Sequence, residues 1–428
     1  MQNATSLPAD RFDAVLSRLP PKLDLDALAR QTKAIERKRV LETGANLLRL
    51  SLARGPGGLS LSQTAAWATL LGFAQMSDPA VKYRLDKAVE FLEAVLAHQL
   101  AATSPGAAVR WAGRILQASD GTCIRERGSK TTDWRVHAVY DLGRGGFSHL
   151  ELTDGRGAEA ITRGAPIAGE IRIADRYFGR AGTMRQFREQ SGNQADFIVR
   201  VGWSALSLTR PDGKAFDLIA HLRGLPHDMK PHEVIVLART GKLTPALKLR
   251  LIIQRKTQEA TSATRKTLLK EASRKQKTLD PSSLVAAEFM IIATSLPPED
   301  YPAEEILAVY RLRWLIELAF KRLKSLLNID AVPTRTERAS RSWLYAHLIL
   351  SPVVRRSQPG IPGSFPLRTC SMRHTCRRCG APGSSPAGCC SPPSSERSPS
   401  PTCSTPVRTS IAALPIHDES ENRASTTQ

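Results

Sequence analysis

The sequence predicts an α/β protein with a helical region at its N-terminus and a β-rich stretch inside the α/β region. Three observations support this prediction. Residues 10–102 repeat apolar side chains at helical spacing, residues from about 112 onward alternate in short segments typical of strands, and residues 302–350 return to helical runs. The 428 residues, 41% hydrophobic and 24% charged, are enough for two or three folded domains.

The N-terminal helices are expected to bury one apolar stripe and to begin at recognisable caps. After the RGPGG break at 54–58, Ser60 or Ser62 can cap one helix, and the sequence from Ser77 to Pro79 signals the start of the next. This pair is either a DNA-binding helix-turn-helix or an ordinary helical hairpin, and the pattern does not separate the two. The stripe consists of Leu28, Ile35, Leu41, Leu47 and Leu48.

Residues 112–154 are predicted to form a three-stranded meander, because the segments GRILQASDGTCIRE, DWRVHAVYDL and GFSHLELTD are separated by turn-forming residues. We then expect a short helix at 157–165, a buried strand in GEIRIADRYFG, a helix in AGTMRQFREQSG and a strand in ADFIVRVGW. Cys123, on the first strand, is expected to be a small buried residue.

Residues 200–256 are expected to be rich in strands, with a hairpin at Pro211, Asp212 and Gly213. AAEFMIIATSLP is a further buried strand, and PAEEILAVYRLRWLIELAFKRLKSLL is one long helix that opens at Pro302. Between these strands, TRKTLLKEASRKQKTL predicts a basic helix that is either a phosphate-facing surface or a solvated helix face. Its cations are Arg265, Lys266, Lys270, Arg274 and Lys275.

The composition changes abruptly after Leu350. Residues 351–428 contain no Lys, are rich in Ser, Pro and Arg, and cannot bury enough apolar surface to offset chain entropy, so we expect this tail to be disordered. CRRC at 376–379 suggests one half of a zinc site, but no second pair stands at zinc spacing and the surroundings are rich in Ser and Pro, which argues against metal binding. A shifted reading frame would also produce such a change in the middle of an apolar helix.

The charge balance indicates a polyanionic partner. Sixty-one Lys and Arg residues face 40 Asp and Glu residues, and the net charge of +21 favours nucleic acid over a membrane surface. No apolar run reaches the roughly 18 residues of a membrane span, and the N-terminus lacks a signal peptide pattern. We expect a cytoplasmic, nucleoid-associated protein with no membrane partner. A single cysteine before residue 351 argues against a disulfide framework.

The segment YRLRWLIELAFKRLK, residues 310–324, places an acid among cations. On a continuous helix, Tyr310, Arg313, Glu317 and Lys324 fall within about one sixth of the circumference. Arg313 and Glu317 at i,i+4 spacing also form the ion pair of an ordinary amphipathic helix. Glu317 is therefore either a metal ligand close to phosphates or one half of a salt bridge.

The spacing Tyr-x2-Arg-x3-Glu-x6-Lys resembles the signature of DDE transposases of the insertion-sequence-four type. Two aspartates that end short apolar strands fit the same family: Asp120 in ILQASDGTCI and Asp175 in IRIADRYFG. The match runs in order from about 60 to 350. The resemblance implies a ribonuclease-H-like core with a β-rich insertion between Asp175 and Glu317.

The chemistry of strand cleavage explains why such residues are needed. Two Mg²⁺ ions, with Mn²⁺ as a substitute, stabilise the attacking and leaving oxygens, and hard cations prefer carboxylate oxygens. Asp120, Asp175 and Glu317 are the expected ligands. The resemblance further implies that DNA phosphates are held by Tyr310, Arg313, Lys324 and Arg176.

Trp203, close to the start of the insertion, either stacks on an extruded base or belongs to the core.

The predicted function is cut-and-paste transposition of an insertion sequence, with double-stranded DNA as partner and a homodimer that brings two element ends together. The N-terminal helices would read terminal inverted repeats. Two alternatives stay open: an inactive relic that only binds DNA, and a zinc-dependent DNA-binding regulator. The expected divisions are 1–105 (helical, DNA-binding), 106–199 (core, first part), 200–283 (β-rich insertion with basic helix), 284–350 (core, second part) and 351–428 (tail).

Overall fold

The computed structural model describes residues 12–37, 40–102, 110–241, 244–327, 329, 331–334 and 336–356. The chain divides into two units, residues 1–363 and 364–428, and the second lies outside the described residues. The predictions of disorder and of a zinc half-site at residues 357–428 also lie outside them. The prediction of disorder is wrong for residues 351–356, which complete helix α13 (Glu337–Arg356). Helix propagation from the apolar segment before them explains this continuation.

The predicted N-terminal helices are confirmed. Ser60 caps α4 with a reciprocal capping box that involves Gln63, and α5 begins at Asp78 as expected. The apolar stripe is buried, but the described residues between Gln31 and Gly44, 32–37 and 40–43, are not helical. The helices are α1 (Phe12–Leu16), α2 (Leu25–Gln31), α3 (Gly44–Arg54), α4 (Leu61–Leu70), α5 (Asp78–Lys87) and α6 (Val89–Ala101).

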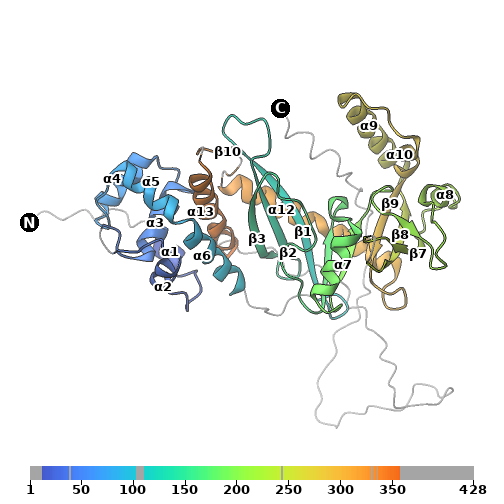
Figure 1. The fold of residues 1–428 in the computed structure, drawn as a ribbon, viewed down its shortest axis with the longest axis horizontal. Coiled ribbons are helices and arrows are strands. Elements are labelled where there is room, and N and C mark those ends of the chain that lie inside the picture. The colour runs from blue at the N-terminus through green and yellow to red at the C-terminus, as the bar shows by residue number, and fades with distance from the viewer. Residues whose placement is uncertain are drawn as a thin grey trace, which may run out of the picture. The chain divides into compact units, whose positions relative to one another are not determined.

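The described residues form a mixed ten-stranded sheet (Figure 1). Its strand order is β3-β2-β1-β4-β5-β9-β8-β7-β6, and β10 pairs separately with β1. The first three strands are the predicted antiparallel meander, whereas β1, β4 and β5 are parallel to one another. The strands are β1 (Ile115–Glu126), β2 (Trp134–Asp141), β3 (Gly146–Asp154), β4 (Glu170–Ala174), β5 (Asp196–Arg200), β6 (Leu208–Thr209), β7 (His232–Ala238), β8 (Leu247–Arg255), β9 (Phe289–Thr294) and β10 (Ala331–Val332).

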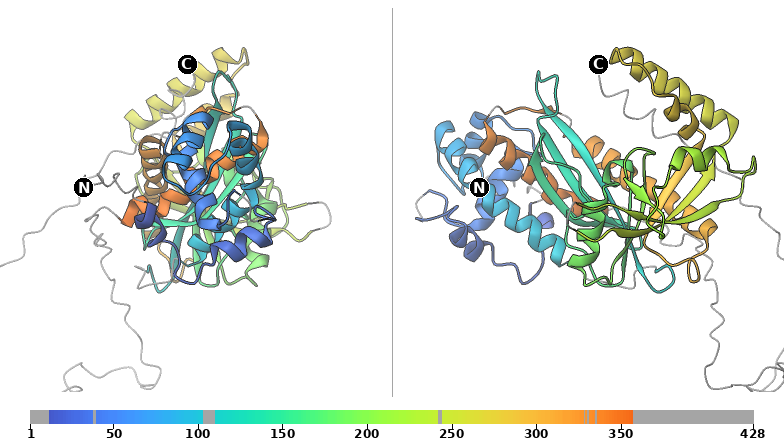
Figure 2. Two further views of the ribbon diagram at one scale, coloured as in Figure 1. Left: turned by 90° about the vertical axis from the view of Figure 1, so that its left-hand side faces the viewer. Right: turned by 45° about the vertical axis from the view of Figure 1, so that its right-hand side comes forward.

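Different helices cover the two faces of the sheet, because neighbouring side chains on a strand point to opposite faces. On one face, Ile173 and Ile198 share a core with α11 (Ala303–Tyr310), while Leu150 shares one with α12 (Trp314–Leu327) and α13. On the other face, Phe197 packs with α7 (Ala181–Gln190) and α8 (Leu218–Arg223). Figure 2 shows α13 beside the N-terminal helices, although Arg338 of α13 and Glu90 of α6 are 248 residues apart.

The strands of the predicted β-rich insertion continue the same sheet. β8 pairs with β9, and β9 pairs with β5, so β6, β7 and β8 extend the sheet beyond β9. The predicted hairpin is confirmed, since Gly213 N donates to Arg210 O at 2.9 Å and Gly213 has a positive φ of 84°. The sequence did not indicate α8. The basic helix is present as α9 (Gln258–Arg274), followed by α10 (Pro281–Ala286).

The helix expected at 157–165 is wrong: the structure describes this whole segment, and it contains turns but no helix. Its carbonyl groups are bound by a side chain instead. Arg172 Nη1 donates to the carbonyl oxygens of Ile161, Arg163 and Gly164 at 2.8–3.0 Å. Carbonyls that accept from a guanidinium in this way fix an irregular chain path, because their hydrogen-bonding needs are met without a helix.

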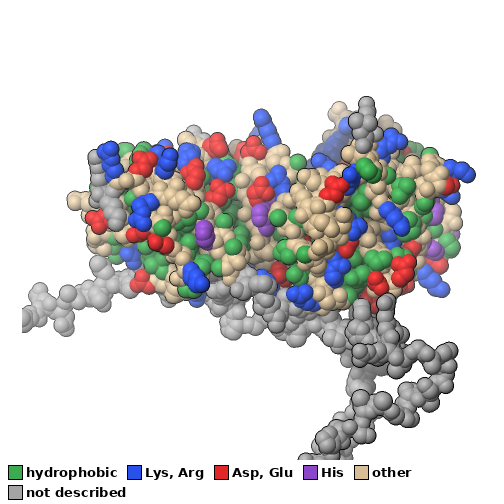
Figure 3. Space-filling model, turned by 60° about the horizontal axis from the view of Figure 1, so that its bottom comes forward, with side chains coloured by type: hydrophobic (Ala, Val, Ile, Leu, Met, Phe, Trp, Pro, Cys, Tyr) green, Lys and Arg blue, Asp and Glu red, His purple; other side chains and the backbone are tan. Residues whose placement is uncertain are grey.

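Charge on the surface is mixed rather than segregated on the face shown in Figure 3, where Lys and Arg side chains alternate with Asp and Glu. The net positive charge therefore does not form one continuous basic patch on that face. In the part of the chain that the structure describes, no helix is long and apolar enough to cross a membrane.

Candidate active site

Two aspartates occupy neighbouring positions on two parallel strands. The pairing of β1 with β4 ends at Ser119 and Ala174, so Asp120 and Asp175 are the next residues on their two chains. Adjacent strands are about 4.8 Å apart, which brings the two residues side by side. Asp120 is 6% exposed and Asp175 is 5% exposed. The sheet thus gathers two acids that are 55 residues apart in sequence.

Local hydrogen bonds orient both carboxylates. Asp175 caps the short 3-10 helix η1 (Arg176–Phe178), where its Oδ1 accepts from Tyr177 N at 2.8 Å. Asp120 Oδ1 accepts from Gly121 N at 2.8 Å. The prediction that Asp120 ends its strand is wrong, because β1 continues to Glu126 while pairing with β2 and then also with β10. Only the pairing with β4 ends beside Asp120.

The segment that carries Glu317 is a helix with a corner rather than the one continuous helix that was predicted. α11 ends at Tyr310, the 3-10 turn η2 (Arg311–Arg313) follows, and α12 begins at Trp314. A 3-10 turn rotates by about 120° per residue instead of 100°. The spacing of 100° per residue, which aligned Tyr310, Arg313 and Glu317 on one side of a continuous helix, therefore does not hold across this corner.

Arg313 and Glu317 form an ion pair, in which Arg313 Nη2 donates to Glu317 Oε1. The side chain of Arg313 is 6% exposed, whereas that of Glu317 is 34% exposed. Tyr310 is 5% exposed and belongs to the core that α11 shares with the sheet. The arginine and the tyrosine thus lie inside, and the acid lies at the border with solvent.

α12 packs against the strand of Asp120. Ile316, Phe320 and Leu323 are buried in the core on that face, and Lys324 Nζ donates to the carbonyl oxygen of Cys123 at 3.1 Å. Cys123 is three residues after Asp120. The expectation that Cys123 is buried is wrong: it is exposed, because strand alternation turns it away from the core that receives Ile124.

The three acids are not gathered into one ligand set. Across the described ranges, no group of three or more His, Cys, Asp or Glu side chains is close enough to hold a metal ion. Three close carboxylates repel one another unless a cation lies among them, whereas Glu317 is here stabilised by Arg313. Carboxylate oxygens are the donor type that suits a hard divalent cation, and Asp120 and Asp175 occupy neighbouring positions while Glu317 is partly exposed.

Of two further candidates for contact with DNA, one is exposed at the surface and the other packs against the core. Arg176 is exposed directly after Asp175, with its guanidinium 5.4 Å from the ring centre of Tyr177. Trp203 packs against the core, and its Nε1 donates to Ser283 Oγ at 3.3 Å. Trp314, one turn before Glu317, is 50% exposed, and the sequence pattern had not marked it as a site residue. A large aromatic residue between Arg313 and Glu317 was the available signal.

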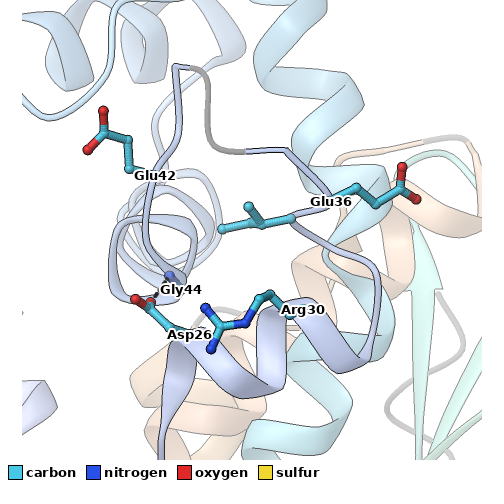
Figure 4. A pocket seen from close by; sticks show the side chains of 6 residues that line it. Asp26, Arg30, Glu36, Glu42 and Gly44 are labelled. Carbon is cyan, nitrogen blue, oxygen red and sulfur yellow. Dashed lines mark hydrogen bonds between the residues drawn. The ribbon is translucent and has the colours of Figure 1, made fainter.

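A separate hollow lies among the N-terminal helices (Figure 4). Asp26 Oδ1 accepts from Gly44 N at 2.6 Å there, and a Cβ on Gly44 would lie 2.1 Å from Leu25 O, so only glycine allows this approach of α2 to α3. The cavity measures about 40 Å³ and has room for a few water molecules at most. It is too small for a nucleotide, and the acids on the sheet are therefore the better candidate for chemistry on DNA.

Comparison with known proteins indicates the family of this chain. Residues 111–351 match the family described as transposase DDE domain. The chain is 38% identical over 342 residues to the protein InsL for insertion sequence element IS186A of Escherichia coli (strain K12), which covers 79% of this chain and 92% of that protein. It is 38% identical over 343 residues to the transposase for insertion sequence element IS421 of Escherichia coli, with the same coverage.

The chain belongs to the transposase DDE domain family. It is an insertion-sequence transposase, an enzyme that cuts and joins DNA strands, and DNA is its partner. DDE transposase domains generally use divalent metal ions.

Proposed function

We propose that this transposase is of the insertion-sequence-four type and that Asp120, Asp175 and Glu317 form its metal-binding site. The observation that supports this most directly is the register of β1 and β4, because it places the two aspartates at neighbouring positions of one sheet edge. The packing of α12 on β1 brings the helix of Glu317 to the same face. When bound, two Mg²⁺ ions, or Mn²⁺ in their place, would stabilise charge on the attacking and leaving oxygens.

In this proposal the Arg313–Glu317 pair exchanges its partners. A phosphate that reaches the site competes with Glu317 for the guanidinium, which can hold it through two parallel hydrogen bonds. Glu317 is 34% exposed, so its carboxylate can turn toward the aspartates without first leaving a buried position. Lys324 would leave the carbonyl oxygen of Cys123 for a second phosphate. Both basic residues thus hold DNA in the cleavage state.

The remaining residues predicted to contact DNA differ in how exposed their side chains are. Arg176 is exposed beside Asp175 and is accessible to a phosphate, whereas Tyr310 is buried and is better placed to fix the corner before Arg313. The exposed ring of Trp314 is more accessible than that of Trp203 for stacking on a base. We further propose that the enzyme works by cut-and-paste transposition, that a homodimer holds two element ends, and that the N-terminal helices read the terminal repeats.

A DNA-binding relic without cleavage activity is the second candidate. The observations that favour it are the ion pair that occupies Glu317 and the change in composition after Leu350. Such a relic would bind element ends with a steep salt dependence and would never cut them.

The test uses purified full-length protein and linear DNA that carries the terminal inverted repeats, with Mg²⁺. We expect Asp120→Asn and Glu317→Gln to lower strand cleavage by roughly a thousandfold or more, the size of loss typical of a removed catalytic group, while DNA binding is retained. Chelation of divalent metal should abolish cleavage in the unchanged protein. Gel analysis of nicked products measures both effects.

The matched control is Glu189→Gln. Glu189 also forms an i,i+4 pair with an arginine, Arg185, but on α7, which covers the opposite face of the sheet. This variant should cleave like the unchanged protein. If Glu189→Gln and Glu317→Gln lose cleavage equally, any i,i+4 pair has this effect, which counts against a metal-binding role of Glu317. If the unchanged protein binds the DNA without cleaving it, the relic is supported.

A further inference from the structure

Helix α9 stands at the same edge of the sheet as the two aspartates. β8 ends at Arg255, which pairs with Phe289 at the start of β9. Because β8 and β5 are both antiparallel to β9, and β5 is parallel to β4, the end of β8 lies at the edge where Asp175 follows β4. Two strands separate β4 from β8, a sideways offset of about 14 Å. By register Ala174 lies level with Leu251, so β8 runs beyond the level of Asp175 to Arg255 before α9 begins at Gln258. Figures 1 and 2 show α9 projecting past the sheet.

One side of α9 carries a row of cations. Lys266, Lys270 and Arg274 follow one another at four-residue spacing, which places them within about 80° around the helix and spreads them over about 12 Å along it. All three are exposed. Within the described ranges, no ion pair involves any of them. Glu271 lies one turn before Arg274 but pairs with Lys275, and Glu259 lies about two turns before Lys266.

The opposite side of α9 fixes the helix to the rest of the protein. Thr261 is buried, Lys256 Nζ donates to Thr264 Oγ1 at 3.0 Å, and Arg265 Nη2 donates to Glu288 Oε1 at 2.7 Å. At 100° per residue, these contacts are centred about 170° away from Lys270. The helix is thus held by one side and presents its cations on the other. Leu269, exposed beside the row, is a single apolar side chain and no hydrophobic patch.

We propose that α9 is a clamp for the phosphate backbone of duplex DNA that extends sideways from the aspartate edge. This proposal rests on the proposed carboxylate site, which explains why DNA lies at this edge. Three cations over about 12 Å match the rise of three to four base pairs at about 3.4 Å each. Contacts from Lys and Arg to phosphates carry no sequence information. The clamp therefore holds any duplex and assists the terminal repeats and the target DNA equally.

The test measures binding of full-length protein to two short duplexes, one with the terminal repeat and one of unrelated sequence, by fluorescence anisotropy at several salt concentrations with EDTA. Each phosphate contact adds about 0.9 to the slope of log affinity against log salt. The triple variant Lys266→Gln/Lys270→Gln/Arg274→Gln should therefore lose about 2.7 from the slope on both duplexes. Over a fourfold change in salt, that difference amounts to about 40-fold in affinity.

The matched control lies at the C-terminal cap of the same helix. Lys275 has its Nζ 3.9 Å from Glu271 Oε2 and lies about 140° around the helix axis from Lys270, so Lys275→Gln removes the same charge outside the row. We expect Lys270→Gln to lower the slope by about 0.9 and Lys275→Gln to leave it nearly unchanged. Far-ultraviolet circular dichroism verifies folding, and the single variants decide the matter if the triple variant unfolds.

Three outcomes would overturn the clamp: an unchanged slope in the variants of the row, equal losses for Lys270→Gln and Lys275→Gln, or a loss on the terminal-repeat duplex alone. Failure of the carboxylate site is seen separately, because binding is measured without divalent metal. The cleavage variant Asp120→Asn should bind with the slope of the unchanged protein. A transposase without cleavage but with a working α9 would still show the salt effect.

Discussion

Two arginine–glutamate pairs in this molecule have the same chemistry and different surroundings. In the pair of Arg172 with Glu170, the side chains are 1% and 0% exposed. In the pair of Arg313 with Glu317, they are 6% and 34% exposed. The first pair lies on the sheet face that α7 covers, and the second lies at the border of α12. The difference separates a charge that is enclosed by the fold from a charge at its border, which in the proposed site changes its partner.

The guanidinium of Arg172 is committed to structure. Besides Glu170, it donates to three carbonyl groups of the segment that connects β3 with β4 and to Gln117 Oε1 at 3.3 Å, and it lies 4.9 Å from the ring centre of Phe187. Burial raises the pKa of Glu170, and the neighbouring Arg172 opposes this rise. No exchange with DNA is open to such a residue, because every new contact would break several buried ones.

The largest expected effect is on the buried pair. Arg172→Met leaves Glu170 without its cation and three carbonyl groups without a donor, so the free energy of unfolding should fall by about 3–5 kcal/mol. Glu317→Gln should change it by less than about 1 kcal/mol, since the amide oxygen of glutamine still accepts from Arg313 and the side chain at 317 is 34% exposed. Urea denaturation followed by circular dichroism measures both values.

A second variant tests the cause of that loss. Glu170→Gln/Arg172→Met removes the buried charge but keeps an oxygen for Ile167 N, which now donates to Glu170 Oε2 at 2.8 Å. This double variant should be more stable than Arg172→Met alone. If the two are equally unstable, the lost carbonyl contacts dominate over the unpaired charge. Similar losses for Arg172→Met and Glu317→Gln would remove the distinction between the two pairs.

Local features of the sequence were sufficient for most strands and helices. Alternating residues between turn signals located β1 to β5, and Ser60 located the start of α4. The corner at η2 carries no Gly or Pro, so nothing local marked it. The connection after β3 depends on Arg172, which comes later in the sequence, and so local helical spacing misled there.

The candidate site was predictable in its residue types and less so in its geometry. The neighbouring positions of Asp120 and Asp175 follow from strand pairing, which a single sequence does not record. The spacing of Arg313 and Glu317 correctly predicted their contact. It could not decide whether this ion pair persists or is exchanged for other contacts when DNA binds. That choice depends on exposure, which is a property of the whole fold.

The buried histidine His137 gives a second test of how burial governs the behaviour of a charge in this fold. His137 is 2% exposed, its Nε2 lies 3.0 Å from Thr153 Oγ1, and burial, aided by the charge of Arg163, lowers its pKa to about 4. The unfolded chain takes up this proton near pH 6.5, and the folded chain does not. Stability is therefore complete above about pH 6.5 and falls by up to about 3 kcal/mol as the pH drops toward 4.

The variant His137→Gln isolates this contribution. His347 is also buried with a pKa lowered to about 4, so the variant should retain part of the loss and show a clearly weaker pH dependence between pH 6.5 and 4.5. Urea denaturation at a series of pH values gives the slope for each protein. Identical slopes for the variant and the unchanged protein would mean that His137 is able to take up its proton in the folded state.

The smallest expected effect concerns a third arginine–glutamate pair. This pair separates the effect of exposure from that of hydrogen-bond geometry. Arg338 of α13 donates to both oxygens of Glu90 on α6, at 2.9 and 2.7 Å, and this bond lowers the pKa of Glu90. The geometry is bidentate, yet the side chains are 46% and 50% exposed. Arg338→Ala should therefore lower the free energy of unfolding by less than about 1 kcal/mol, and added salt should shrink the difference further. A loss as large as that of Arg172→Met would show that the number of contacts, rather than burial, decides what such a pair contributes.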